Sequence, residues 1–316
     1  MKILVQILIA LAFAAGSALT PVVVAAQSNN TASILNHCWG CNYGAVDWHG
    51  RNLRSVHASG VNLERANLRG TDLRDADFSG VNFEGADLRD TDLRGANFSG
   101  CDLAGAQLRG AKVTGTRFSG IDLTHHTLDH LSGDAARAIL SNCSGCNLEG
   151  VDLSGRELRG VHLIGANLQR ANLQNADLRG ARLLGCNFQG AKLRGAKLEG
   201  ASLVGSNLEG VDLISADLHA VHMVGTNARN AKLNNANLDG AVLCGQETHI
   251  DGDDTQRTVI HGKTVCTELE GADLSGTRMH HIQRCTWDEG PAPSCAVVSA
   301  QTLRDVAHAN LTGAQL

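Results

Sequence analysis

The sequence predicts an all-β solenoid with a four-sided coil. Two observations predict this fold: a unit of five residues recurs along most of the chain, and residues of one kind recur at a spacing of twenty. The composition agrees, because aromatic residues make up 3% of the 316 residues while 36 residues are glycine. An ordinary core built around large side chains is therefore not expected.

The five-residue unit consists of a small residue, Asp or Asn, Leu or Phe, a polar residue, and usually Gly. We call the Leu or Phe position the centre and the position two residues before it the small position. Centres fall five residues apart over Leu63–Leu128 and Leu148–Leu243. This period fits neither an α-helix nor a straight strand. On an extended chain the small position and the centre are two residues apart and share one face, but the next small position, three residues beyond the centre, would point outward. A corner is therefore expected in each unit, at glycines such as Gly70 and Gly80.

Columns of like residues at a spacing of twenty give the length of one coil. Stacked coils place residues one full turn apart next to each other, so their neighbours resemble one another. The columns are Ser59, Ser79, Ser99 and Ser119, then Phe78, Phe98 and Phe118, then Arg69, Arg89 and Arg109. Four units per coil, and hence a square solenoid, are predicted.

The repeated unit resembles the pentapeptide-repeat proteins, whose motif is A-(D/N)-L-x-x. Matching copies are ANL at 66, ADF at 76, ADL at 86 and ANL at 166, and the resemblance covers about residues 41–128 and 146–243. It implies the family's fold, a right-handed quadrilateral β-helix. The lack of proline between Pro21 and Pro291 agrees with this fold, since each coil needs backbone donors for its neighbour.

Residues 1–26 have the order of a secretory signal peptide. Lys2 precedes an apolar run, Ile3–Ala15, and small residues end at Ala26 before Gln27. The mature protein is therefore expected to be exported, either to the periplasm or out of the cell, with no membrane span after signal removal. Export allows disulfides to persist among the ten cysteines. The net charge of −5 gives no signal for polyanion binding, so no nucleic-acid partner is expected.

The chain divides into six predicted segments. These are the signal peptide (1–26), an N-terminal cap (27–40), a first repeat block (41–128), a helical connector with a second cap (129–145), a second repeat block (146–243), and a Cys-containing C-terminal region with short residual repeats (244–316). The connector helix is predicted to start near Asp134, which would cap Ala135 onward. Departures from the repeat are Ala58 and Ala228 at centres, and His126 and Arg156 at small positions.

Two similar segments, ILNHCWGCN at 34–42 and ILSNCSGCN at 139–147, each contain a C-x-x-C pair. Cys38 and Cys143 occupy centres and Cys41 and Cys146 occupy the next small positions, so all four are predicted to face the axis as caps that start each block. A redox-catalytic pair would instead need an exposed helix N-terminus. A single zinc site would need all four ligands within about 2.3 Å of the metal, whereas one rod separates the pairs by roughly 25 Å at the ~4.8 Å spacing of paired strands.

The other six cysteines fall into two groups. Cys101 and Cys186 occupy small positions and are predicted to be buried thiols. The pairings Cys244–Cys266 and Cys285–Cys295 would close two loops in the C-terminal region, although the sequence does not fix the connectivity.

Two polar clusters contain residue types that bind metals. They are Thr124, His125, His126, Asp129 and His130, and then His249, Asp251, Asp253, Asp254 and His261. Neither cluster has the spacing of a calcium loop or a zinc site. A solvated end of the first block and a surface insertion are therefore predicted, with no metal or cofactor.

Stacked arginines give a candidate anion-binding face, made of Arg69, Arg89 and Arg109 on one side of the coil and Arg74 and Arg94 on the adjoining side. Asp72, Asp75, Asp90 and Asp92 lie among them, so a self-compensated face is predicted. The alternative is a site for sulfated, phosphorylated or uronic polymers.

No nucleophile with a nearby base, phosphate-binding loop or carboxylate pair in a cleft is recognisable, so no catalytic residue is predicted. We predict a non-enzymatic exported solenoid that acts as a binding or scaffolding surface in the cell envelope, for an unknown protein or envelope polymer. The resemblance implies one alternative, a DNA mimic that protects gyrase from quinolones, which requires a cytosolic location and a strongly acidic face. A thiol- or carbohydrate-active envelope protein is another. The final NLTGAQL restarts the repeat at Leu311 and Leu316, so an end-to-end homodimer is a further hypothesis.

Overall fold

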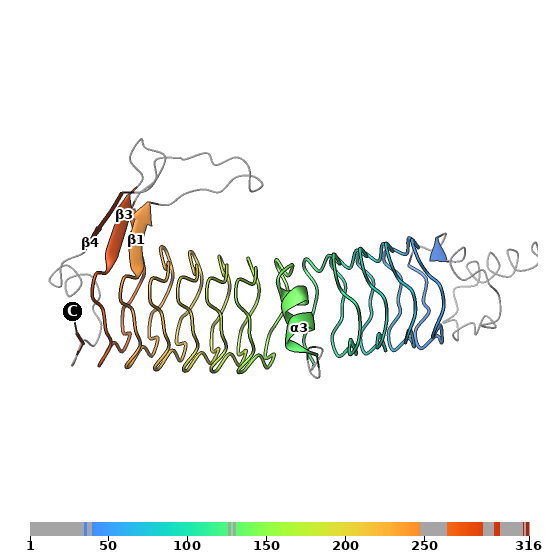
Figure 1. Ribbon diagram of the computed structural model, residues 1–316, viewed down its shortest axis with the longest axis horizontal. Helices are drawn as coiled ribbons and strands as arrows, with labels where there is room; N and C mark the ends of the chain where they lie inside the picture. The colour runs from blue at the N-terminus through green and yellow to red at the C-terminus, as the bar shows by residue number, and fades with distance from the viewer. Residues whose placement is uncertain are drawn as a thin grey trace, which may run out of the picture.

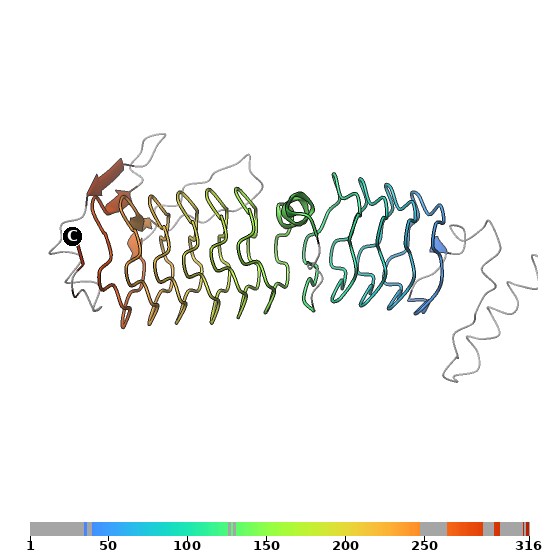
Figure 2. The ribbon, with the colours of Figure 1, turned by 60° about the horizontal axis from the view of Figure 1, so that its bottom comes forward.

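The computed structural model describes residues 35–36, 40–125, 128, 131–246, 264–286, 294–297, 312 and 314–315. These residues form one elongated rod of stacked coils, with the early repeats at one end and the C-terminal region at the other (Figure 1). Figure 2 shows the same stack after a turn about its long axis.

Parallel β-bridges between residues twenty apart define the coil. Successive bridges in the first coil join Asn42 to Asn62, Asp47 to Asn67, Asn52 to Asp72, and His57 to Asp77. Each coil therefore has four sides with one five-residue unit on each, as the twenty-residue spacing predicts. Backbone hydrogen bonds on each side link each coil to the next, such as Tyr43 N to Asn62 O at 2.8 Å, Ala45 N to Glu64 O at 2.7 Å and Asn62 N to Cys41 O at 2.9 Å.

The interior is filled by the centres and the small positions. In the first block, the ring centroid of Phe98 lies 5.5 Å from that of Phe78, 5.1 Å from that of Phe83 and 6.0 Å from that of Phe118. Ala58 and Ala228 are also fully buried although they are small residues at centres. The corners have left-handed backbone, with φ between 53° and 78°. Glycine is frequent there because it tolerates this conformation.

Several buried polar residues at small positions hydrogen-bond to the coil before them. Thr116 Oγ1 donates to Leu93 O at 2.7 Å, and Ser206 Oγ donates to Leu183 O at 2.6 Å. The thiols of Cys101 and Cys186 make equivalent bonds, at 2.9 Å to Phe78 O and 2.6 Å to Leu163 O. Both cysteines are free and buried, as predicted, and burial raises the pKa of each thiol to about 12.

The connector interrupts the coil without breaking the rod. Asp122 bridges to Asn147, which is 25 residues on rather than twenty, and helix α3 (Gly133–Leu140) lies in the longer turn. The predicted helix cap at Asp134 is wrong, because the helix begins at Gly133 and Ser132 is the cap. The hydroxyl of Ser132 accepts a hydrogen bond from Ala135 N at 3.3 Å, and Asp134 lies inside the first turn. Ala136, Ile139 and Leu140 are buried against the rod.

Four short strands form a sheet at the C-terminal end of the rod (Figure 1). They are β1 (Val242–Gln246), β2 (Thr264–Cys266), β3 (Gln283–Thr286) and β4 (Ser294–Val297), in the order β2-β1-β3-β4. Strand β1 pairs with β2 in an antiparallel and with β3 in a parallel arrangement, and β3 pairs with β4 in an antiparallel one. A disulfide joins Cys244 to Cys266, the pairing that the sequence favours. The backbone register places Cys285 opposite Cys295.

The coil resumes after β2. Asn227 bridges to Glu268 and Asn237 to Arg278, and Leu274 and Met279 are buried again. Gln315 also stacks on the rod, since it bridges to Arg278. Leu311 and Leu316, the predicted final centres, lie outside the described residues. Within the described part of the chain, no helix is both long and apolar enough to cross a membrane.

Candidate functional site

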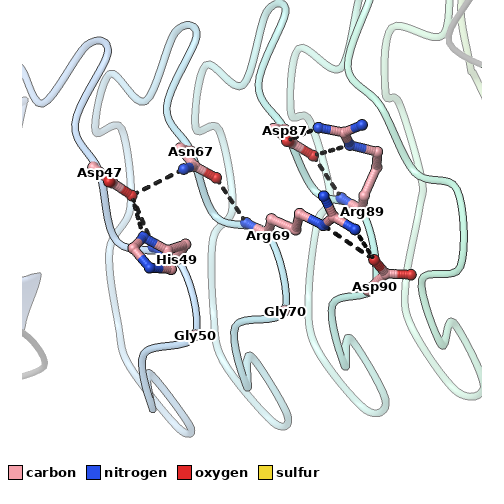
Figure 3. A pocket seen from close by; sticks show the side chains of 9 residues that line it. All are labelled: Asp47, His49, Gly50, Asn67, Arg69, Gly70, Asp87, Arg89 and Asp90. Carbon is pink, nitrogen blue, oxygen red and sulfur yellow. Dashed lines mark hydrogen bonds and ion pairs between the residues drawn. The ribbon is translucent and has the colours of Figure 1, made fainter.

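A depression of about 490 Å³ lies on one side of the first repeat block. Its lining comes from three successive coils: Asp47, His49 and Gly50, then Asn67, Arg69 and Gly70, then Asp87, Arg89 and Asp90 (Figure 3). The lining includes two of the arginines in the predicted anion-binding face. We call this region the arginine face and extend the name to Arg74, Arg94 and Arg109.

The repeat itself positions these side chains. In each unit, the Asp or Asn before the centre accepts a hydrogen bond from the backbone N–H two residues further on. The distances are 3.3 Å from Arg69 N to Asn67 Oδ1 and 3.1 Å from Arg89 N to Asp87 Oδ1. Such a turn fixes the two outward residues of a unit, which are the Asp or Asn before the centre and the residue after the centre. Where the residue after the centre is arginine, the turn places it beside the acidic or amide residue.

Ion pairs within and between coils fill the face. Arg89 donates from Nε and Nη2 to the carboxylate of Asp87, at 2.8 and 2.5 Å. Arg69 instead reaches Asp90 in the next coil, with Nε 3.2 Å from Oδ2 (Figure 3). At the start of the face, Asp47 Oδ1 lies 2.7 Å from His49 Nδ1.

The adjoining side of the coil repeats this arrangement. Arg74 donates to both oxygens of Asp72, at 2.8 and 2.6 Å, and Arg94 does the same to Asp92, at 2.8 and 2.6 Å. Arg54 pairs with Asp75, the third acid predicted on this side, at 3.0 Å. The hydrogen bonds from Arg94 lower the pKa of Asp92 to about 2, and those from Arg74 lower the pKa of Asp72.

Four of the five predicted arginines therefore form an ion pair with an aspartate. Arg109 differs, because it is exposed and has no carboxylate partner among the described residues. An incoming anion would have to compete with Asp72, Asp87, Asp90 and Asp92 for the other four. Most of the positive charge of the arginine face is therefore already paired with carboxylates.

The cysteines of the second cap lie inside the rod. Cys143 and Cys146 are fully buried and joined by a disulfide, with their Cα atoms 5.4 Å apart. They follow the C-terminal end of α3, whereas catalytic thiols are favoured at a helix N-terminus. Cys41 is also disulfide-bonded, and Cys38 lies outside the described residues.

Most residues of the two candidate metal clusters lie outside the described residues. In the first cluster only Thr124 and His125 are described, and their side chains contact each other at 3.0 Å between Oγ1 and Nδ1. The whole second cluster falls in the undescribed segment 247–263. Across the described residues, no group of three or more His, Cys, Asp or Glu is placed to hold a metal ion.

One surface feature was missed by the sequence analysis. Ile164, Leu184, Val204 and Val224 occupy the outward position after the centre, which is usually polar, and they follow one another at a spacing of twenty. Ile164 is 37% exposed and the other three are half-buried. We call these four residues the aliphatic column. The signal that could have revealed it is an aliphatic residue before glycine in every fourth unit.

The comparison with known proteins agrees with this geometry. A profile of pentapeptide repeats matches in eight copies that include residues 52–85, 86–124 and 141–180 and, in overlapping windows, 157–195, 171–210, 191–227 and 222–245. No curated protein is significantly similar in sequence.

Solved structures of pentapeptide-repeat proteins are similar at low identity. HetL from the cyanobacterium Nostoc sp. strain PCC 7120, involved in heterocyst differentiation regulation, is 22% identical over 91% of this chain and 92% of its own, with a TM-score of 0.39. A trypsin-treated form of QnrB1, a plasmid-mediated fluoroquinolone resistance protein, is 16% identical over 83% of this chain and 92% of its own, with a TM-score of 0.30. Rfr23 from the cyanobacterium Cyanothece 51142 is 19% identical over 61% of this chain and 88% of its own, with a TM-score of 0.17.

Proposed function

The chain belongs to the pentapeptide-repeat family, and we propose that it is a non-enzymatic exported solenoid whose outer faces act as a binding or scaffolding surface in the cell envelope. The proposed scaffold is the right-handed quadrilateral β-helix that the family resemblance implies. The leader-like residues 1–26 and the disulfides Cys143–Cys146 and Cys244–Cys266 support the location, since disulfides persist in oxidising compartments.

The observation that carries this proposal is the continuity of the ladder through the connector, from Asp122 to Asn147. It makes both repeat blocks one rod, so outward columns of side chains extend along a single surface. Solenoids of this kind present long binding surfaces because each repeat adds one more row to the same face. An elongated partner would therefore contact several coils at once.

We propose the arginine face as the main contact surface and a protein as its partner, ahead of an envelope polymer. Its arginines alternate with aspartates, and paired charges suit a surface that offers both signs. A uniformly anionic polymer would gain only Arg109 without displacing a carboxylate. Electrostatic complementarity of this kind sets partner specificity and the association rate more than affinity.

The two alternative functions receive less support. A DNA mimic needs a continuous acidic face, but here Asp72, Asp87 and Asp92 pair with arginines. A thiol-active protein needs a reactive cysteine, but the pKa of the buried thiols of Cys101 and Cys186 is raised to about 12. Thiolates are the reactive form, so these two thiols are poor nucleophiles.

The location is tested by the intact mass of the protein recovered from fractionated cells under non-reducing conditions. A chain that starts at Gln27, found in the envelope fraction and lighter than its all-thiol mass by whole disulfides, is expected. A full-length, fully reduced chain found only in the cytosol would contradict the proposal and reopen the gyrase-type alternative.

The contact surface is tested by placing a photo-crosslinking residue at position 89 in the first block and, as a matched control, at position 194 in the second block. Arg89 and Arg194 occupy the same place in the unit and the same side of the coil. We expect a discrete crosslinked envelope protein from position 89 and a weaker product or none from position 194. Equal products from both positions, or none from either, would contradict the arginine face as the contact surface.

A further inference from the structure

The side of the coil that carries Arg74 continues along the whole rod. Parallel bridges link the residues before its centres from position 52 to position 112 in the first block and from position 157 to position 278 in the second. Both stretches belong to one side, because position 112 is two units before Asp122, position 157 is two units after Asn147, and these two residues bridge the connector. We call this side the paired side.

The paired side offers both signs of charge in several of its coils. Each coil has one outward residue before the centre and one after it, and these form a leading column and a trailing column along the rod. The coils with an acidic residue in one column and Lys or Arg in the other hold Asp72 with Arg74, Asp92 with Arg94, Glu157 with Arg159, Asp177 with Arg179, and Lys197 with Glu199. Among the described residues of the other three sides, such a coil occurs at Asp87 and Arg89, whereas Lys192 and Arg194 have like charges. The paired side therefore differs from the others in that its charges can complement a second copy of themselves.

A second copy complements this pattern when the two rods lie parallel. A two-fold axis that runs along the rods, between two paired sides, places each leading column opposite the trailing column of the other copy at the same height. Asp92 of one copy then faces Arg94 of the other, and Lys197 faces Glu199 although the order of the two signs is reversed in that coil. An axis across the rods would instead align the two leading columns, in which acidic residues outnumber basic ones.

The arginines of the paired side can bind a second carboxylate. Arg74 donates from Nε and Nη2 to Asp72, at 2.8 and 2.6 Å, and Arg94 and Arg179 bind the aspartates of their own coils through the same two atoms. A guanidinium also has two N–H donors on Nη1, which lie outside these bonds. The three arginine side chains are between 34% and 48% exposed, so their outer edges are open to another molecule.

The second block adds charged residues that have no ion pair of their own. Glu157, Lys197 and Glu199 are exposed, and none of the three forms an ion pair with another described residue. In the parallel arrangement, Lys197 and Glu199 of each copy face Glu199 and Lys197 of the other. Opposite charges on facing surfaces steer the association of two proteins and fix their alignment.

The paired side is large enough for a specific but reversible contact. From position 52 to position 278 it extends over roughly ten coil spacings, or roughly 48 Å at the ~4.8 Å spacing of paired strands. Four extended residues across the side span roughly 13 Å, so each copy contributes roughly 600 Å². Specific interfaces begin at about 600 Å² per partner and have a standard size of about 800 Å². A dimer that dissociates on dilution is therefore expected.

We propose that a second copy of this chain docks on the paired side, and that the two rods form a parallel dimer held by charge pairs between leading and trailing columns. This dimer supplies the partner for the part of the arginine face that carries Arg74 and Arg94, and it rests on the proposal that this face contacts a protein. The side that carries Arg69 and Arg89 lies outside the contact and remains open to an envelope partner.

Analytical ultracentrifugation of the whole chain tests the proposal, at a series of concentrations in low and high salt. Two charge reversals in one coil are compared, Lys197→Glu and Glu199→Lys. Each variant alone places like charges opposite each other at both symmetric contacts, whereas an equal mixture of the two variants restores opposite charges at both. Lys232→Glu is the matched control, since Lys232 is also exposed and precedes a centre, but on the side that carries Arg69. Circular dichroism verifies that the variants keep the rod.

We expect a wild-type dimer that weakens as salt rises, because salt screens exposed charges. Each reversal alone should raise the dimer dissociation constant by about tenfold or more, while the mixture and Lys232→Glu should stay within about threefold of the wild type. Recovery on mixing separates a contact between copies from an effect within one chain.

A wild type that stays monomeric at every concentration would overturn the proposal. A dimer that is insensitive to both reversals would also do so, because the copies would then meet end to end or through another side, and so would a failure of the mixture to recover. A monomeric wild type that still gives a crosslinked envelope protein from position 89 would remove the dimer and leave the proposed function standing.

Discussion

The first and second repeat blocks share one backbone plan but differ in what they show to solvent. At the same place in the coil, the first block has serines that bond within their own units, such as Ser79 Oγ to Asp77 Oδ1 at 2.8 Å. The second block has the aliphatic column. Since both blocks stack with the same twenty-residue ladder, the fold does not determine these outward residues. A departure that persists over four coils is therefore more informative about binding than any residue of the core.

The interiors differ as well, but in the opposite sense. The first block has a cluster of four phenylalanines at centres. Among the described residues of the second block, Phe188 is the only phenylalanine at a buried centre, and the other buried centres are mainly leucine. Both solutions fill the same four-sided coil. The difference predicts unequal sensitivity of the two blocks to loss of a large side chain.

Phe98→Ala is expected to have the largest effect among the variants of the rod. Phe98 contacts three other rings, so truncation leaves a cavity between coils and costs about 3–5 kcal/mol. Leu183→Ala, at the matching centre of the second block, is expected to cost about 2–4 kcal/mol. Hydrogen exchange measured separately for residues 41–125 and 146–243 assigns each loss to its block.

The comparison would fail if Leu183→Ala reduced protection in the second block by more than Phe98→Ala reduced it in the first. Conservative variants provide the control. Phe98→Leu removes ring volume without emptying the site and should cost less than Phe98→Ala.

Arg156→Ala is expected to have the next largest effect, at the junction between the blocks. Arg156 occupies a small position, and its guanidinium donates to Leu128 O at 2.9 Å and to Leu131 O at 3.3 Å. Hydrogen bonds from a charged group contribute about 1.5–3 kcal/mol. Faster hydrogen exchange confined to α3 and residues 146–155 is the expected result.

Arg159→Ala is the matched control for the junction. Arg159 lies one residue past the next centre and makes an ion pair with Asp177 in which its own side chain is 56% exposed. Such pairs contribute about 0–1 kcal/mol. Equal effects of the two substitutions would show that Arg156 does not hold the connector in place.

The residues that repeat were predictable from sequence, and those that depend on contacts between unlike segments were not. The ladder follows from the spacing of centres such as Leu63 and Phe83, because each unit specifies its own corner. Arg156 could be recognised as a departure from the pattern, but not as a donor to the connector, since Leu131 and Leu128 precede it by 25 and 28 residues instead of the regular twenty. The position of Ser132 at the helix cap likewise depends on the residue at which the regular coil ends before α3.

Acid is expected to have the smallest effect and to act mainly on the first block. Hydrogen bonds from Arg74, Arg89 and Arg94 lower the pKa of Asp72, Asp87 and Asp92, the last to about 2. A carboxyl whose pKa is lower in the folded than in the unfolded chain stabilises the fold above its unfolded pKa of about 3.9, and loses this contribution as pH falls through its folded pKa. The first block should therefore lose hydrogen-exchange protection between about pH 4 and pH 2.

The acid effect should be modest because these pairs are partly exposed to solvent and screened by salt. Asp92→Asn removes one of the titrating groups and should flatten the pH dependence of the first block, while leaving that of the second block unchanged. Loss of protection in the second block before the first would contradict the assignment. Such a result would mean that the ion pairs of the arginine face are positioned for a partner and do not stabilise the rod. The two blocks would then differ in their surfaces but not in the interactions that stabilise them.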